Sequence, residues 1–201
     1  MIVIIDYGVG NILNVKSGFE RIGLNPVLTD DPQAILDADL AILPGVGAFN
    51  AAMEQLTSRG LDKVIIERAS QGKNIIGICL GMQLLFEKSY ENGESQGLGL
   101  LKGSIIPFEE TLKVPHMGWN KLVHQRQDPL VDLMPEDAFV YFVHSFYLDQ
   151  YEEDTLVSYT NYGVKVPAIV RKRNIAGMQF HPEKSGKIGR QLLINIKELL
   201  S

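Results

Sequence analysis

The sequence predicts an α/β protein whose central sheet is mostly parallel, is covered by helices on both faces and continues into antiparallel strands. In the first half, short runs of apolar and β-branched residues alternate with helical patterns. Around Cys79, one such run passes through a tight turn directly into a helix. In the second half, strand patterns follow one another with turn residues between them. Alternating strands and helices indicate parallel pairing, and consecutive strands indicate antiparallel pairing.

The first half is predicted to alternate strand and helix. Residues 2–6 form an apolar run that ends at Asp6, as expected for a buried strand. Asn11 is expected to cap the next helix, whose apolar residues recur every three or four positions and which stops at Gly23. The other elements predicted here are strands at 26–28, 40–43 and 75–78 and helices at 48–59, 61–71 and 80–88.

The second half is predicted to be mainly strand. Turn residues at 161–163 and 172–174 favour hairpins, and therefore antiparallel neighbours. An amphipathic helix at 188–200 closes the chain, and we expect residues 1–201 to form one domain. The predicted strands are 100–106, 120–124, 139–142, 146–149, 156–160, 164–170 and 175–180.

Composition limits the function classes. The net charge of −5 and the pI near 5.4 argue against a general nucleic-acid binder. One cysteine allows no intramolecular disulfide, which fits a reducing compartment. The N-terminus lacks the pattern of a signal peptide, and no apolar run approaches the ~20 residues of a membrane span. We therefore expect a cytoplasmic protein.

Cys79 lies where the strand at 75–78 meets the helix that begins at Leu80. Gly77 and Gly81 stand two residues to either side, and small residues there allow a sharp, strained turn that presents a nucleophile. Unpaired N–H groups at the start of a helix favour the thiolate. The pattern predicts a reactive thiol, with a buried structural cysteine as the alternative.

A thiol nucleophile needs a base, and the base needs an orienting group. His181 ends a predicted strand and is followed by Pro182 and Glu183. Residues i and i+2 of an extended segment point the same way, so Glu183 can bind one imidazole nitrogen and leave the other facing Cys79. Functional groups of open α/β sheets gather beyond the carboxyl ends of the strands, and both Cys79 and His181 follow strands. The alternative for residues 181–183 is a surface turn with a solvated carboxylate.

Two glycine turns follow other strands. The turn at 44–47 can aim backbone N–H groups outward, and together with the N–H of Leu80 it predicts donors for an oxyanion; an ordinary strand-to-helix loop is the alternative. The turn at 6–11 lacks the third glycine of a dinucleotide fingerprint, because position 13 is Leu13. No metal-ligand spacing is present among the histidines and acids, so neither a dinucleotide nor a metal is expected.

Residues 77–83 together with residues 181–183 resemble the class I, or triad, glutamine amidotransferase family. Within that family, residues 6–11, 115–120, 141–146 and 181–185 resemble the glutaminase subunits of imidazole glycerol phosphate synthase, an enzyme of histidine biosynthesis. The resemblance covers essentially the whole chain. It implies the flavodoxin-like fold of the family and no cofactor.

The resemblance also implies roles for individual residues. Cys79 would attack the side-chain amide of glutamine, His181 would carry the proton to the departing ammonia, and Glu183 would orient His181. The thioester would then be hydrolysed to glutamate. Phe146 stands where the family usually has tyrosine, which puts any role for a hydroxyl there in doubt. The remaining roles implied are an oxyanion hole at Gly47 and Leu80 and glutamine contacts at Gly45, Gln83, Ser145 and Phe146.

In the resembling subunits, ammonia passes to a (β/α)₈-barrel cyclase that is a separate chain in bacteria and archaea. The resemblance therefore implies a heterodimer in which glutaminase activity depends on the partner. Trp119, Tyr141 and Lys184 match positions that face the cyclase. Without the resemblance, a core tryptophan, a strand aromatic and a solvated charge are the favoured interpretations of Trp119, Tyr141 and Lys184.

Three other functions remain open from the sequence. A glutaminase could serve a different synthase, such as the pyridoxal phosphate, anthranilate or guanylate enzymes, although residues 115–120 argue against this. A cysteine hydrolase of the peptidase or deglycase type would tend to carry histidine directly after the nucleophile, where this chain has Leu80. A non-catalytic binding module could retain the same fold.

Overall fold

The computed structural model describes residues 1–199, and its centre is a mixed sheet with strand order β2-β1-β3-β4-β14-β13-β12-β9. The pairs from β2 to β14 are parallel, and those from β14 to β9 are antiparallel. This confirms the predicted fold class. The strands of this sheet are β1 (Ile2–Ile5), β2 (Val27–Thr29), β3 (Leu40–Leu43), β4 (Asn74–Ile78), β9 (Val123–His124), β12 (Leu156–Tyr162), β13 (Val164–Lys172) and β14 (Ile175–Met178).

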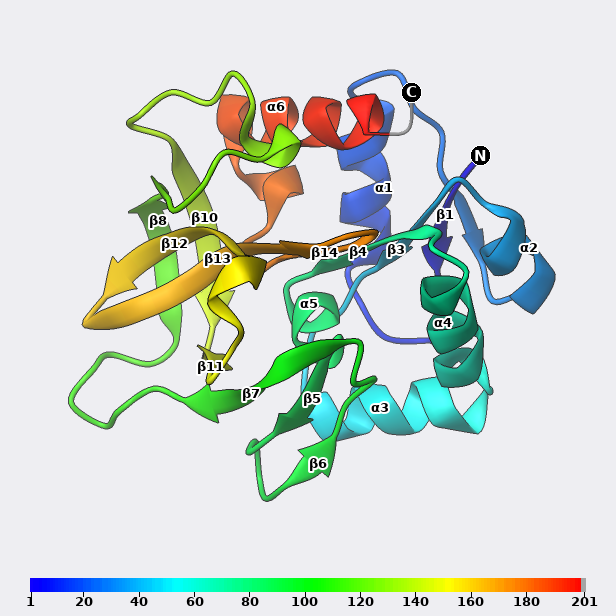
Figure 1. Ribbon diagram of the computed structural model, residues 1–201, viewed down its shortest axis with the longest axis horizontal. Helices are drawn as coiled ribbons and strands as arrows, with labels where there is room; N and C mark the ends of the chain where they lie inside the picture. The colour runs from blue at the N-terminus through cyan, green and yellow to red at the C-terminus, as the bar shows by residue number, and fades with distance from the viewer. Residues whose placement is uncertain (200–201) are drawn as a thin grey trace.

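Helices cover both faces of the sheet (Figure 1). Helices α1 and α6 lie on one face, and α3, α4 and α5 lie on the other. No helix within residues 1–199 is long and apolar enough to cross a membrane. The helices are α1 (Ile12–Glu20), α2 (Pro32–Asp37), α3 (Phe49–Ser58), α4 (Leu61–Ser70), α5 (Leu80–Leu84) and α6 (Gly186–Glu198), with single 3₁₀ turns at η1 (Pro129–Val131), η2 (Glu153–Thr155) and η3 (Pro182–Lys184).

Two smaller sheets are built from the middle of the chain. One is an antiparallel pair of β8 (His116–Lys121) and β10 (Phe139–His144). The other has the order β11-β7-β5-β6, in which β5 and β7 are parallel. Its strands are β5 (Phe86–Ser89), β6 (Ser95–Gln96), β7 (Leu101–Pro107) and β11 (Phe146–Asp149).

The alternation of side chains along each strand divides the core between the two faces. In β1, Val3 and Ile5 belong to the cluster that also contains Phe49 of α3, whereas Ile2 and Ile4 belong to the cluster with Phe19 of α1. Strands that are buried on both faces need apolar residues at every position. This is why the first half of the sequence shows unbroken apolar runs instead of alternation.

Several predicted elements are wrong in detail. No element was predicted between residues 29 and 39, but Asp31 caps α2 by accepting hydrogen bonds from the N–H groups of Gln33 and Ala34. The helix expected at 80–88 ends at Leu84, because residues 86–89 pair with β7 instead. The side chain of Asn11 makes no capping bond. The main-chain carbonyl oxygen of Asn11 accepts hydrogen bonds from the N–H groups of Asn14 and Val15.

The other differences concern boundaries. The strand expected at 120–124 is divided at Leu122, whose N–H turns to the carbonyl of Ala138, and β8 begins at His116. The turn expected at 161–163 reduces to Gly163, because β12 continues to Tyr162. Strand β6 was not expected at all. The closing helix begins at Gly186, and residue 200 of the predicted range lies outside the described residues.

Arg68 of α4 connects α2 to the start of β4 through buried hydrogen bonds. Its guanidinium is fully buried and donates to the carbonyl oxygens of Ile35, Leu36 and Asn74 at 2.6–3.3 Å. Burial lowers the pKa of Arg68 to about 10. Arg68→Met would remove these buried bonds, although the Leu36 carbonyl would still accept from Lys73 Nζ, so we expect the free energy of unfolding to fall by about 3 kcal/mol in urea denaturation.

The matched control for this substitution is Arg190→Met on α6, where the arginine is exposed. A solvent-exposed change of this kind should alter the free energy of unfolding by less than about 0.5 kcal/mol. Equal effects of the two substitutions would show that the buried bonds of Arg68 do not stabilise the fold.

Candidate active site

Cys79 occupies a sharp elbow between β4 and α5. Its φ of 56° and ψ of −116° lie outside the usual regions for a residue with a side chain. The two flanking glycines make this elbow possible, since a Cβ on Gly81 would lie 1.8 Å from the carbonyl oxygen of Leu43. A Cβ on Gly77 would lie 2.5 Å from the carbonyl oxygen of Gly81. The chain can therefore turn at Cys79 only where its neighbours lack side chains.

His181 follows β14, the strand that pairs with β4, so strand register brings the imidazole to the thiol. Met178 is paired with Ile78, one residue before Cys79. His181 Nδ1 and Glu183 Oε1 are 2.8 Å apart, and both side chains are buried. The His181 main chain is fixed as well, because its N–H donates to the carbonyl of Tyr141 at 3.1 Å and its own carbonyl accepts from the hydroxyl of Ser185 at 2.7 Å.

The electrostatics of His181 favour the protonated ring. Burial by itself would lower its pKa, but hydrogen bonds to Cys79 and Glu183 and the charges of these two residues outweigh that effect. The net result is a pKa of about 9 for His181. An imidazolium beside the sulfur stabilises a thiolate and can later deliver a proton to a leaving group.

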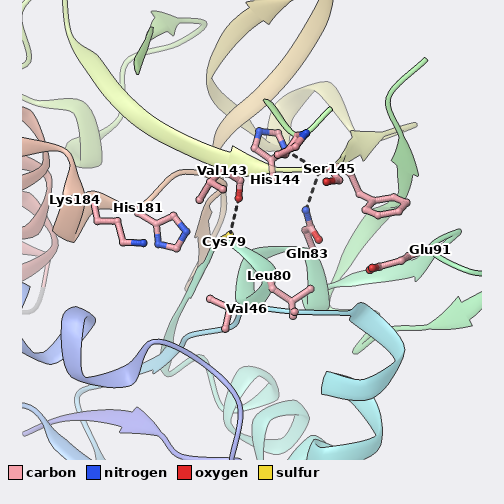
Figure 2. A pocket seen from close by; sticks show the side chains of 13 residues that line it. Val46, Cys79, Leu80, Gln83, Glu91, Val143, His144, Ser145, His181 and Lys184 are labelled. Atoms are coloured by element: carbon pink, nitrogen blue, oxygen red, sulfur yellow. Dashed lines mark hydrogen bonds between the residues drawn. The ribbon is translucent and has the colours of Figure 1, made fainter. Parts of the chain in front are cut away.

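Cys79 and His181 open into a cavity of about 380 Å³ (Figure 2). In this view His181 and Lys184 lie on one side of Cys79, and Gln83 and Glu91 lie on the other. A cavity of this volume suits a small molecule such as an amino acid. The residues that line the cavity are Val46, Gly47, Cys79, Leu80, Gln83, Glu91, Pro115, Val143, His144, Ser145, Phe146, His181 and Lys184.

The end of the cavity away from His181 offers hydrogen-bond acceptors. Gln83 uses its amide nitrogen twice, donating to the carbonyl of Phe146 at 3.0 Å and to Gln179 Oε1 at 2.9 Å. Its Oε1 is then the acceptor of the side chain. Glu91 also lines the cavity, and one of its oxygens accepts from the N–H of Phe49 at 2.9 Å. An amide oxygen and a carboxylate together suit the ammonium group of an amino acid.

The predicted oxyanion turn borders the same cavity. Gly47 lines it with a φ of 93°, and Val46 beside it is exposed. Gly45, predicted as a glutamine contact, is buried and does not line the cavity. A Cβ on Gly45 would come within 2.9 Å of Leu80 and of the Tyr7 hydroxyl, so this glycine allows close packing beneath the turn. Tyr7 fixes the turn by donating to the carbonyl of Pro44 at 2.7 Å.

The three residues predicted to face a partner are all at least partly exposed, and one of them borders the cavity. Lys184 lines it and is exposed. Trp119 is 56% exposed on β8, directly opposite Tyr141 on β10, with ring centroids 6.1 Å apart. Among residues 1–199, no group of three or more His, Cys, Asp or Glu side chains could hold a metal ion.

Comparison with known proteins supports the predicted family. The profile described as "Glutamine amidotransferase class-I" matches residues 3–197. "Imidazole glycerol phosphate synthase subunit HisH" from Oceanobacillus iheyensis is 52% identical over 200 residues and is covered completely, as is this chain. The same subunit from Carboxydothermus hydrogenoformans is 50% identical with full coverage of both chains, and that from Bacillus subtilis is 46% identical over 99% of this chain and 96% of its own.

The chain belongs to the class I glutamine amidotransferase family, among the HisH subunits. The resemblance stated from the sequence is therefore confirmed. Solved structures agree at the level of fold. A glutamine amidotransferase crystal structure is 16% identical with a TM-score of 0.79, covering 100% of this chain and 99% of that one. The PurLQS structure from Thermotoga maritima is 22% identical with a TM-score of 0.78, covering 100% and 98%.

Three residues of this amidotransferase site were not predicted from its sequence. Glu91 lies in the turn after β5, where Tyr90-Glu91-Asn92-Gly93 reads as ordinary turn sequence. Gln179 is fully buried beside Gln83, and His144 lines the cavity. Of these three residues, only His144 could have been identified from the sequence, because it directly precedes the predicted glutamine contacts Ser145 and Phe146.

The raised pKa of His181 predicts how the stability of the amidotransferase depends on pH. A folded-state pKa of about 9 exceeds the unfolded value near ~6.5, so the stabilisation is complete below about pH 6.5 and is lost as the pH rises through about 9. We expect this group to contribute a decline of about 3 kcal/mol in the free energy of unfolding across that window.

Cys79→Ala is the matched variant for this measurement, because it removes one of the two residues that raise the pKa of His181. Urea denaturation at several pH values should show a smaller decline in the variant than in the unaltered chain. Identical declines would rule out Cys79 as a cause of the raised pKa.

Proposed function

We propose that this chain hydrolyses glutamine to glutamate and ammonia through a thioester on Cys79. One observation carries the proposal: a single cavity has a thiol and a buried imidazole–carboxylate pair at one end and acceptors for an ammonium group at the other. A glutamine bound by Gln83 and Glu91 would extend its side-chain amide toward Cys79. The cavity, the elbow and the family membership all support this reaction.

The reaction would proceed by attack of Cys79 on the amide and then by hydrolysis of the thioester. The Cys79 thiolate attacks the amide carbon, and the negative charge on the oxygen is held by the N–H groups of Gly47 and Leu80. His181 donates its proton from Nε2 to the departing nitrogen, which leaves as ammonia. His181 then accepts a proton from water, whose oxygen attacks the thioester carbon; the C–S bond breaks, and glutamate leaves while the Cys79 thiolate and protonated His181 are restored. Glu183 keeps the ring oriented throughout, through its bond to Nδ1.

We also propose that the ammonia passes to a (β/α)₈-barrel cyclase subunit in a heterodimer of the cytoplasm. The relatives that are 46–52% identical are named as subunits of imidazole glycerol phosphate synthase, which supports a partner subunit. Trp119, Tyr141 and Lys184 would face that partner, since Lys184 lines the cavity and is exposed, and Trp119, which lies opposite Tyr141, is 56% exposed. Residues 1–201 would act as one amidotransferase domain.

The deciding experiment measures glutamate release from glutamine by the purified chain, alone and with the cyclase subunit and its nucleotide ligand. We expect the partner to stimulate release strongly. Glutamate release at the same rate with and without the cyclase would support the glutaminase activity but refute the proposed partnership with the cyclase. No release under either condition would refute the glutaminase itself, and labelling of Cys79 by a glutamine-mimicking electrophile, with glutamine as competitor, would show whether the cavity still binds glutamine.

A further inference from the structure

His116 on β8 and His144 at the end of β10 are a buried pair with no part in the chemistry described so far. They lie opposite one another in the antiparallel pair and are only 2% and 7% exposed. Aromatic rings enclose them, since His116 stacks on Tyr162 and on Phe142 with centroids 3.9 and 4.7 Å apart. Two imidazoles in such surroundings need hydrogen-bond partners, and the identity of these partners indicates what the pair does.

The hydrogen bonds of the pair run in one direction. His144 Nδ1 is 2.8 Å from the carbonyl oxygen of Phe146, which only accepts, so this nitrogen carries the proton. Burial lowers the pKa of His144 to about 3 and that of His116 to about 4, and both rings are neutral. His144 Nε2 must then accept the proton of His116 Nδ1, 2.9 Å away. His116 Nε2 in turn accepts from the side-chain amide of Asn120 at 3.4 Å.

This series of bonds ends on a group of the candidate glutamine site. The Phe146 carbonyl accepts from His144 and also from Gln83 Nε2. The position of this carbonyl therefore determines the orientation of the Gln83 side-chain amide. Gln179 Oε1 accepts the second N–H of that amide. With both hydrogens engaged, Gln83 presents its oxygen as an acceptor.

We propose that His116 and His144 are positioning residues of the glutamine site, which hold the Phe146 carbonyl and, through it, the Gln83 amide in the orientation that binds substrate. The inference rests on the proposed function and assigns a task to two residues outside the triad. Loss of His144 removes a donor from the carbonyl. Loss of His116 frees the proton of His144 to move to Nε2, which would leave Nδ1 as an acceptor facing another acceptor.

Kinetics of glutamine hydrolysis in the complex with the cyclase provide the main test. We expect His144→Leu and His116→Leu to raise the KM for glutamine about tenfold or more, with kcat changed less than about threefold. His144→Asn, whose amide nitrogen can replace Nδ1 as donor to the Phe146 carbonyl, should recover most of the affinity. His124→Leu is the control, because His124 is an exposed histidine on β9 that bonds to Ser158 and does not line the cavity.

A spectroscopic measurement tests the bond directions separately. Nitrogen-15 spectra of the histidine rings should show both His116 and His144 with the proton on Nδ1, the less populated form of free histidine. An unchanged KM in both leucine variants, no recovery in His144→Asn, or protons on Nε2 would each overturn the inference. If His144→Leu does not fold, His116→Leu and His144→Asn decide the question. An unaltered complex that releases no glutamate would overturn the proposed function, and this inference with it.

Discussion

Cys79→Ala should abolish glutamine-dependent synthesis by the complex, with a loss on the order of 10⁴-fold or more. The reason is that the elbow presents one sulfur to the cavity and no other cysteine exists in the chain. Synthesis from added ammonia by the same complex should be unchanged, because the thiol acts only in ammonia generation. Both rates are measured as product formation, with glutamine or with an ammonium salt as nitrogen source.

Two results would contradict this prediction in different ways. Loss of the ammonia-dependent rate as well would show that the chain has a direct part in the partner's chemistry. Glutamine-dependent synthesis that survives the substitution would remove Cys79 from the reaction. Affinity of the variant for the cyclase serves as the control for folding, since Cys79 is buried and offers little surface to a partner.

Gly81→Ala should impair both stability and catalysis, although it adds only one methyl group. The added Cβ would lie 1.8 Å from the carbonyl oxygen of Leu43, a main-chain atom in the neighbouring strand that cannot rotate away. The elbow would have to shift, and with it the thiol. We expect about 3 kcal/mol lower free energy of unfolding and about 10²-fold or more lower glutamine hydrolysis.

Gly72→Ala is the control for this substitution. Unlike Gly81, Gly72 has a positive φ, 75°, but nothing lies within 4 Å of its would-be Cβ. In the Gly72→Ala variant, the free energy of unfolding should fall by about 1 kcal/mol from backbone strain alone, and the rate of glutamine hydrolysis should be unchanged. If Gly81→Ala behaved like Gly72→Ala, the close approach of the elbow to β3 would have no part in catalysis.

Local patterns explain what could be read from the sequence. Cys79 between two glycines and His181 two residues before Glu183 are short-range arrangements, and each carries its geometry within a few residues. Helix α2 was equally readable from Asp31 and Pro32, where a capping side chain precedes a proline in the first turn. It was missed because the segment is short and polar at its start.

Long-range packing explains what could not be read. Residues 86–88 continue a helical pattern, and only their pairing with β7 turns them into a strand. Glu91 reaches the cavity because the turn after β5 lies against the first turn of α3, as its bond to Phe49 records. Gln179 directly follows β14 and bonds to Gln83 of α5, and these two elements are far apart in the sequence. No local pattern encodes these neighbours.

The pairing of β4 with β14 also sets the moment at which a newly made chain becomes reactive. The ribosome reaches His181 about a hundred residues after Cys79, which at about 5–20 residues per second is an interval of about 5–20 s. During that interval the thiol has neither its base nor the strand that brings the base beside it. A growing chain that has not yet reached His181 therefore lacks the base that the proposed hydrolysis of glutamine requires.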